Sequence, residues 1–217
     1  MARTLLDARL TREQPTSEQK GAKHDMAGDS FVLPRRSLIA LCGPAGAGKS
    51  TFVGGIVRHN HLAATTVVSS DACRLMLCDE TRLLTRDQWA ALQPSTFQLF
   101  LTIISMRLSI GRGTIADGVN LHRELRAGML ESARKHAYHT ALVVFDLPLE
   151  TCLTQNRQRD EQRRIPEQQI RAQREGLDGI MSHLGDEGWD QVVVLNARQR
   201  SVLIDIESEV GSSAQLP

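Results

Sequence analysis

The feature that most constrains this chain is a glycine-rich segment that lies between an apolar run and an amphipathic one. Residues 43–51 read GPAGAGKST, which fits the pattern G-x-x-x-x-G-K-[ST] in full. The preceding run, SLIALC at 37–42, is short and continuously apolar, as is typical of a strand buried on both faces. A helical pattern begins at residue 49. A strand, a glycine-rich turn and a helix in this order predict a phosphate-binding P-loop.

The residue types in this loop suit a nucleoside triphosphate and its metal ion. The three glycines let the backbone turn tightly and point successive N–H groups at phosphate oxygens. We expect Lys49 to reach the β- and γ-phosphates of ATP and to be catalytic, and the Ser50 hydroxyl to bind Mg²⁺. The predicted nucleotide contacts are Gly43, Ala45, Gly46, Ala47, Gly48, Lys49, Ser50 and Thr51.

Further apolar runs follow the loop, and helical patterns lie between them. The predicted strands are 37–42, 65–69, 113–116, 141–145 and 191–195, and the predicted helices are 49–58, 86–109, 121–137, 149–159 and 166–184. Pro94 indicates a break in the second helix, and a last amphipathic stretch covers 198–209. Strands that alternate with helices predict an α/β fold, here a three-layer, kinase-like P-loop NTPase with a five-stranded parallel sheet and a helical lid.

Length and composition indicate one domain. The chain has 217 residues, of which 41% are hydrophobic. We predict a flexible, polar leader at 1–30, the P-loop domain at 31–210 with its lid at about 150–184, and a tail at 211–217. The formal net charge is +1, so contact with nucleic acid would need a local basic patch.

Cysteine usage and hydropathy indicate the compartment. The cysteines are dispersed without a CxxC pair, at Cys42, Cys73, Cys78 and Cys152, so a disulfide or zinc framework is not expected. No apolar run is long enough to span a bilayer, and the first thirty residues lack a hydrophobic signal core. We therefore expect a cytoplasmic protein without membrane contact.

The segment after the second predicted strand carries the candidate acceptor side. It reads SSDACR and places Asp71 and Arg74 one helical turn apart. Carboxyl ends of neighbouring parallel strands meet at one edge of a sheet, so Asp71 is expected near the γ-phosphate, where it would take a proton from an incoming hydroxyl. Arg74 would hold an anionic part of the acceptor. The alternative for Asp71 is a helix N-cap.

Arginines are frequent between the fourth and fifth predicted strands, where a lid closes over the nucleotide in P-loop kinases. Arg159 and Arg163 are four residues apart, so both could face the phosphates and stabilise charge on the transferred group. The alternative is a solvated helix face, which we favour for Arg171 and Arg174. Asp146 ends the fourth strand like a Walker B aspartate, but we interpret it as mainly structural.

Three segments together resemble the kinase domain of bacterial polynucleotide kinase-phosphatases and phage polynucleotide kinases. These segments are LCGPAGAGKSTF, VVSSDACRLMLCDE and VVFDLPLETCLTQNRQRDEQRRIP. The resemblance implies that Asp71 is the general base for a 5′-hydroxyl, that Arg74 binds the neighbouring 3′-phosphate, and that Arg159 and Arg163 are lid arginines. This sequence departs from the family pattern at two places. Asp117-Gly118-Val119-Asn120 stands where the family often has Asp-Ala-Thr-Asn, and the stretch after Asp79 and Glu80 is expanded.

These observations lead to a function hypothesis and its alternatives. The first is an ATP- and Mg²⁺-dependent polynucleotide kinase that acts on a DNA or RNA 5′-hydroxyl end, with phosphatase or ligase partners on separate chains. The second is a kinase of a small metabolite or antibiotic. The third is a nucleotide-gated binding module or a zeta-toxin-like kinase of sugar nucleotides. Lys49, Ser50 and Asp71 are all present, which disfavours an inactive domain.

Overall fold

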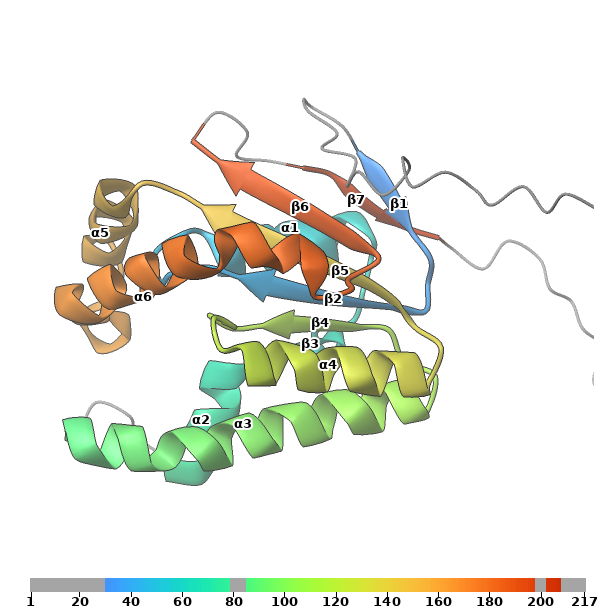
Figure 1. Ribbon diagram of the computed structural model, residues 1–217, viewed down its shortest axis with the longest axis horizontal. Helices are drawn as coiled ribbons and strands as arrows, with labels where there is room; N and C mark the ends of the chain where they lie inside the picture. The colour runs from blue at the N-terminus through green and yellow to red at the C-terminus, as the bar shows by residue number, and fades with distance from the viewer. Residues whose placement is uncertain (1–29, 79–84, 198–201, 208–217) are drawn as a thin grey trace, which may run out of the picture.

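The computed structural model describes residues 30–78, 85–197 and 202–207. Its centre is a five-stranded parallel sheet in the order β3-β4-β2-β5-β6 (Figure 1). The strands are β2 (Ser37–Cys42), β3 (Val67–Ser69), β4 (Thr114–Asp117), β5 (His139–Asp146) and β6 (Gln191–Asn196). The predicted five-stranded parallel sheet is therefore confirmed. The predicted tail at 211–217 and the leader up to residue 29 lie outside the described residues.

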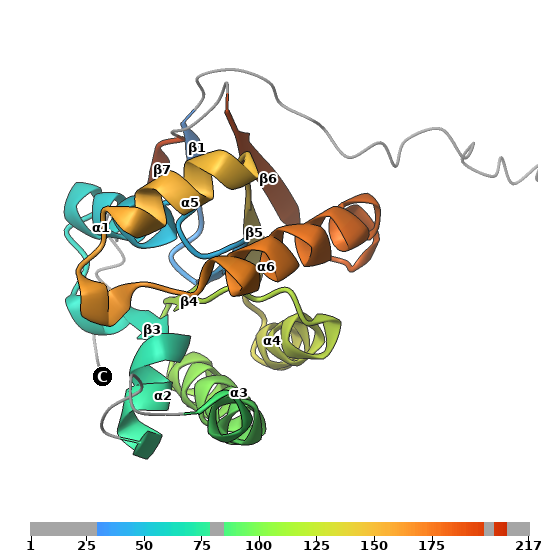
Figure 2. The ribbon, with the colours of Figure 1, turned by 90° about the vertical axis from the view of Figure 1, so that its left-hand side faces the viewer.

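Continuous apolar strands arise because both faces of the sheet are covered. In β2, Leu38 and Ala40 pack in one core cluster, whereas Ile39 and Leu41 pack in the other. The first cluster includes side chains from α3 (Arg86–Ser109) and α4 (Arg123–Lys135). The second includes side chains from α1 (Lys49–His59) and α5 (Leu149–Arg157), which Figure 2 shows on the opposite side of the sheet. These are the three predicted layers.

Two further helices belong to the described part of the chain. The helix α2 (Ser70–Cys78) follows β3 directly, and α6 (Glu167–Ile180) lies between β5 and β6. Short 3₁₀ turns are η1 (Ala64–Thr66), η3 (Glu161–Arg163) and η4 (Met181–Asp186). The first of these turns takes the start of the predicted strand 65–69, so β3 is shorter than expected.

The helix α3 is continuous through Pro94, so the predicted break is wrong. Thr85 precedes the helix and forms a capping box, in which its side chain accepts a hydrogen bond from Gln88 N and its own backbone N–H donates to Gln88 Oε1. Phe100, Ile104 and other apolar side chains bury its inner face. This packing and capping offset the hydrogen bond that proline cannot donate.

A second, two-stranded parallel sheet was not predicted. It pairs β1 (Phe31–Leu33) with β7 (Ile204–Ile206), in the register Phe31 to Ile204. The described part of the amphipathic stretch 198–209 is therefore a strand. Its position is fixed by α1, where Asn60 donates to Ile204 O and accepts from Ile206 N. Within the described residues, no helix is both long and apolar enough to cross a membrane.

Candidate active site

The P-loop connects β2 to α1 and requires its glycines. Gly43, Gly46 and Gly48 all have positive φ angles, of 141°, 80° and 88°. A Cβ atom on Gly46 would lie 2.2 Å from the Cys152 carbonyl oxygen, so α5 packs directly on the loop backbone. The loop therefore has the tight turn that aims backbone N–H groups at phosphates, ahead of a helix N-terminus.

Lys49 is buried, and its ammonium group is held by the loop itself. Its Nζ donates to Gly43 O at 2.8 Å and to Pro44 O at 2.7 Å. Burial lowers the pKa of Lys49 to about 8, against the opposing effect of the Asp117 carboxylate. The ammonium must give up these two hydrogen bonds before it can donate to phosphate oxygens. Ser50 and Thr51 follow in the first turn of α1 and are exposed.

The structure brings Asp117 to Ser50. Asp117 ends β4, the strand beside β2, and the nearby Ser50 side chain lowers the pKa of its carboxyl group. Burial raises the pKa of Asp117, while the Lys49 charge lowers it and the Asp71 charge raises it. A hydroxyl and a carboxylate at this edge are the oxygen ligands that Mg²⁺ prefers. The described residues hold no group of three or more His, Cys, Asp or Glu that could bind a metal.

Sequence reasoning noted Asp117 and Asn120 only as the outer pair of a motif. Their position beside the P-loop follows from the order of the strands, because β4 is the direct neighbour of β2, the strand that leads into the P-loop. Asn120 is buried with a positive φ of 49°, and its amide donates to Leu41 O at 2.7 Å. Gly43 N also donates to Val119 O at 3.0 Å. The segment after β4 is thus hydrogen-bonded to the start of the P-loop.

Asp71 lies at the start of α2, where it is 83% exposed. It is not the helix cap, because the Ser69 hydroxyl accepts the hydrogen bond from Ala72 N. The charge of Asp71 affects the pKa of both Lys49 and Asp117, so its carboxylate lies on the P-loop side of the sheet edge. The structure therefore leaves this carboxylate open toward solvent beside the phosphate site.

Arg74 is buried, whereas the sequence predicted that it would hold an anionic part of the acceptor. Its side chain is 7% exposed, and Nη1 lies 3.0 Å from Asp71 Oδ1. Its Nη2 donates to Gln93 Oε1 at 3.0 Å, and the guanidinium carbon lies 4.2 Å from the centre of the Trp89 ring. Its Nε is buried without a hydrogen-bond partner. Arg74 thus fixes the Asp71 carboxylate and packs α2 against α3.

The lid arginines occupy different environments. The half-buried Arg159 lowers the pKa of both Lys49 and Asp117 through its charge, so its guanidinium lies within electrostatic range of both groups. The expectation that Arg163 shares its helical face is wrong, because α5 ends at Arg157 and Arg163 lies in η3, exposed. Arg164 donates to the Arg159 carbonyl oxygen at 2.9 Å and so supports the turn that carries Arg159.

Two further residues of the lid contact the site from α6. Arg174 lies 2.6 Å from Asp146 and also pairs with Asp178, a geometry that agrees with a structural role for Asp146. Gln173, which sequence reasoning missed, accepts a hydrogen bond from the Ala45 backbone N–H at 2.8 Å. No local pattern distinguishes Gln173 from other polar residues of an amphipathic helix. This contact places α6 directly on the P-loop.

Solved structures with the same fold include several kinases. A protein of Chloroflexus aurantiacus assigned as a kinase has 13% identity and a TM-score of 0.56, over 75% of this chain and 85% of its own. A sugar kinase from Janibacter sp. HTCC2649 has 20% identity and a TM-score of 0.54, over 76% and 87%. The PezAT toxin–antitoxin system of Streptococcus pneumoniae has 14% identity and a TM-score of 0.52, over 79% and 70%.

At these identities the likeness shows the fold alone. A search of curated proteins found no match. A family model described as an AAA domain, AAA_33, matches residues 38–180, from β2 through α6. The match, the P-loop and the kinase-like fold together support a phosphotransferase that uses ATP and Mg²⁺. Because the match covers more than half of the chain, the protein belongs to the AAA_33 family of AAA domains.

Proposed function

We propose that this protein transfers the γ-phosphate of ATP to the 5′-hydroxyl end of a nucleic acid. The observation that carries the proposal is the Asp71–Arg74 pair, joined at 3.0 Å at the sheet edge that also carries the P-loop. An exposed carboxylate beside the phosphate site suits a hydroxyl acceptor, because it can orient the hydroxyl and accept its proton. Arg74 holds that carboxylate in place.

The chemistry assigns each side chain a role. The acceptor oxygen attacks the γ-phosphorus, its proton passes to the Asp71 carboxylate, and the bond from γ-phosphorus to the bridging oxygen breaks to release ADP. Lys49 and Arg159 stabilise the negative charge on the transferred group. Ser50 and Asp117 would hold Mg²⁺, which neutralises charge on the β- and γ-phosphates when bound.

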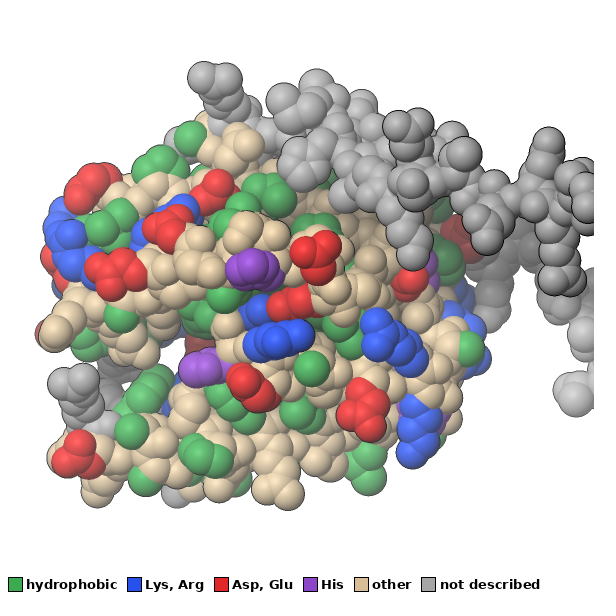
Figure 3. Space-filling model, in the orientation of Figure 1, with side chains coloured by type: hydrophobic (Ala, Val, Ile, Leu, Met, Phe, Trp, Pro, Cys, Tyr) green, Lys and Arg blue, Asp and Glu red, His purple; other side chains and the backbone are tan. Residues whose placement is uncertain are grey.

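The distribution of charge favours recognition of an end over recognition of a long duplex. On the face shown in Figure 3, acidic and basic side chains are interspersed and do not gather into one basic patch. The net charge of +1 is also small for a protein that tracks many phosphates. A substrate read at its terminal nucleotide needs few phosphate contacts.

A second candidate acceptor is a small alcohol, such as a sugar or an antibiotic. The specific observation that favours it is the burial of Arg74, whose guanidinium already contacts Asp71, Gln93 and Trp89. A guanidinium engaged in this way would have to rearrange to clamp a 3′-phosphate. A small alcohol needs no such clamp.

An acceptor panel distinguishes these candidates. Radiolabelled γ-phosphate would be followed from ATP to 5′-hydroxyl DNA and RNA oligonucleotides, to the same oligonucleotides with a 5′-phosphate, and to sugars. We expect label on the 5′-hydroxyl oligonucleotides and none on the blocked ones. Label on sugars alone would overturn the nucleic-acid proposal and leave the kinase assignment unchanged.

A further inference from the structure

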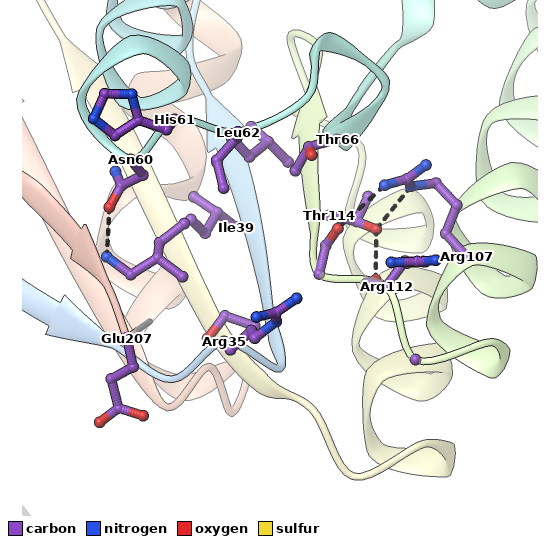
Figure 4. Close-up of a pocket in the computed structure, with 15 residues that line it drawn as sticks. Arg35, Ile39, Asn60, His61, Leu62, Thr66, Arg107, Arg112, Thr114 and Glu207 are labelled. Carbon is purple, nitrogen blue, oxygen red and sulfur yellow. Dashed lines mark hydrogen bonds between the residues drawn. The ribbon is translucent and has the colours of Figure 1, made fainter. Parts of the chain in front are cut away.

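A pocket of about 330 Å³ lies at the opposite end of the sheet from the P-loop (Figure 4). It is bounded by the amino ends of β2 and β4, the turn after α1, and β7. The proposed reaction uses none of its residues. Its volume is in the range of sites for small organic ligands.

Two arginines give the pocket a positive wall. Arg107 belongs to the last turn of α3, and Arg112 belongs to the connection between α3 and β4. The Nε of Arg107 donates to Thr114 Oγ1 at 3.1 Å and its Nη2 to Gly113 O at 3.3 Å, so its guanidinium is fixed. Figure 4 shows both guanidinium groups close together on one side of the pocket.

In the described part of the chain, neither Arg107 nor Arg112 forms an ion pair with an acid. Burial lowers the pKa of Arg107, and the charge of Arg112 lowers it further. Glu207 lines the pocket as well, but in Figure 4 its carboxylate points away from the two arginines. Two adjacent cations at a hollow favour an anionic ligand.

The rest of the lining suits an organic body on that anion. Ile39 and Ile115 line the pocket but are already only about 1% exposed, so a ligand would remove little more of their surface from water. Leu62 and Ile206 add apolar surface from the opposite wall. A fully hydrated inorganic ion would gain nothing from the half-buried Leu62 and Ile206, whereas a phosphate monoester with an apolar group would cover them.

We propose that this pocket binds a small phosphate monoester, with its dianionic phosphate on Arg107 and Arg112 and its organic part against Leu62 and Ile206. The site is separate from the P-loop because β2 and β4 run their full lengths between them. The two sites can therefore be filled independently, and the inference does not depend on the identity of the acceptor.

Calorimetric titration with phenyl phosphate tests the proposal. The whole chain would first be saturated with Mg²⁺ and AMPPNP so that the P-loop is blocked, and ionic strength would be held constant with chloride. We expect one site, and tighter binding of phenyl phosphate than of inorganic phosphate. Replacing both arginines, Arg107→Gln with Arg112→Gln, should weaken binding by about tenfold or more, as loss of charge-assisted hydrogen bonds does.

Matched variants keep the test decisive. Arg112→Gln alone leaves the hydrogen bonds of Arg107 to Thr114 Oγ1 and Gly113 O intact, and it should still weaken binding several-fold if the double variant is unstable. The exposed Arg123→Gln in α4 removes the same charge elsewhere and should bind as the wild type does. Absence of binding to the wild type, or equal weakening by Arg123→Gln or Arg74→Ala, would overturn the proposal.

Discussion

At the scale of single residues, Lys49 is predicted to couple nucleotide binding to pH. Its pKa of about 8 lies below the usual 10.5, so the ammonium loses its proton in the free protein as pH rises through 8. Phosphates stabilise the charged form. We expect ATP affinity to be constant below this pKa and to fall up to about tenfold per pH unit above it.

Calorimetry in buffers of different ionisation enthalpy measures this linkage. Binding at about pH 9 should take up close to one proton, whereas binding at about pH 7 should take up far less through Lys49. Equal uptake at both values would show that the pKa of Lys49 is not lowered in the free protein.

Asp117 is predicted to set the requirement for Mg²⁺. Asp117→Asn removes the carboxylate that meets Ser50 but keeps its size. The concentration of Mg²⁺ that gives half-maximal activity should rise by about tenfold or more, because a neutral amide oxygen is a weaker ligand than a carboxylate. Asp186→Asn, an exposed residue in η4, is the control. An unchanged Mg²⁺ requirement in Asp117→Asn would contradict this role.

The sequence allowed some of these residue roles to be predicted and not others. Lys49 and Ser50 belong to one local motif whose geometry is fixed by its glycines. Asp117 and Gln173 could not be assigned, because their contacts depend on which strand and which helix pack beside the loop. For Arg74, spacing predicted a position on the same side of the helix as Asp71, but its burial against Trp89 depends on α3.

At the scale of elements, α3 carries a proline that costs stability. Pro94 lacks the N–H that would complete the helical hydrogen bond, although α3 stays continuous. Pro94→Ala should raise the free energy of unfolding by about 1–3 kcal/mol. Urea denaturation measures it, with the exposed neighbour Ser95→Ala as a control that should change stability by less than about 0.5 kcal/mol. A lower unfolding midpoint in Pro94→Ala would contradict the prediction.

The five strands of the main sheet were predictable because each is an apolar run. The two-stranded sheet of β1 and β7 could not be predicted in this way. The strands β1 and β7 have three residues each and pair across almost the whole domain, Phe31 with Ile204. Segments this short carry little periodicity. Their pairing depends on the side-chain hydrogen bonds of Asn60, at the end of α1, which no local pattern predicts.

At the scale of the whole molecule, a buried ion pair links α4 to the segment before β6. Arg126 Nη2 lies 2.5 Å from Glu187 Oε1, and Arg126 Nη1 donates to Asn120 O at 2.9 Å. Burial raises the pKa of Glu187, but hydrogen bonds from Arg126 and Trp189 outweigh this effect and lower it overall. The pair therefore supports the loop beside the P-loop.

The lowered pKa of Glu187 predicts how the stability of the protein changes at low pH. A carboxyl whose pKa is lowered by folding contributes stability above its unfolded pKa of about 4.5, and this contribution is lost as pH falls. Glu187→Gln should cost about 3–5 kcal/mol at neutral pH, because Arg126 stays buried without its partner. The stability of Glu187→Gln should also depend less on pH below about 4.5 than that of the wild type.

Denaturation at several pH values measures both effects. The double variant Arg126→Met with Glu187→Met should recover much of the loss, because an apolar pair leaves no buried charge. A Glu187→Gln variant that matched the wild type in stability at neutral pH would show that the pair contributes nothing to folding.

The most direct test of the proposed reaction separates ATP binding from phosphoryl transfer at Asp71. Single-turnover transfer of radiolabelled γ-phosphate to a 5′-hydroxyl oligonucleotide would be compared in the wild type, Asp71→Asn and the exposed control Asp186→Asn. We predict unchanged ATP affinity in all three and a transfer rate about a hundredfold or more lower in Asp71→Asn alone. Transfer by Asp71→Asn at the rate of the wild type would contradict the assignment of Asp71 as the base.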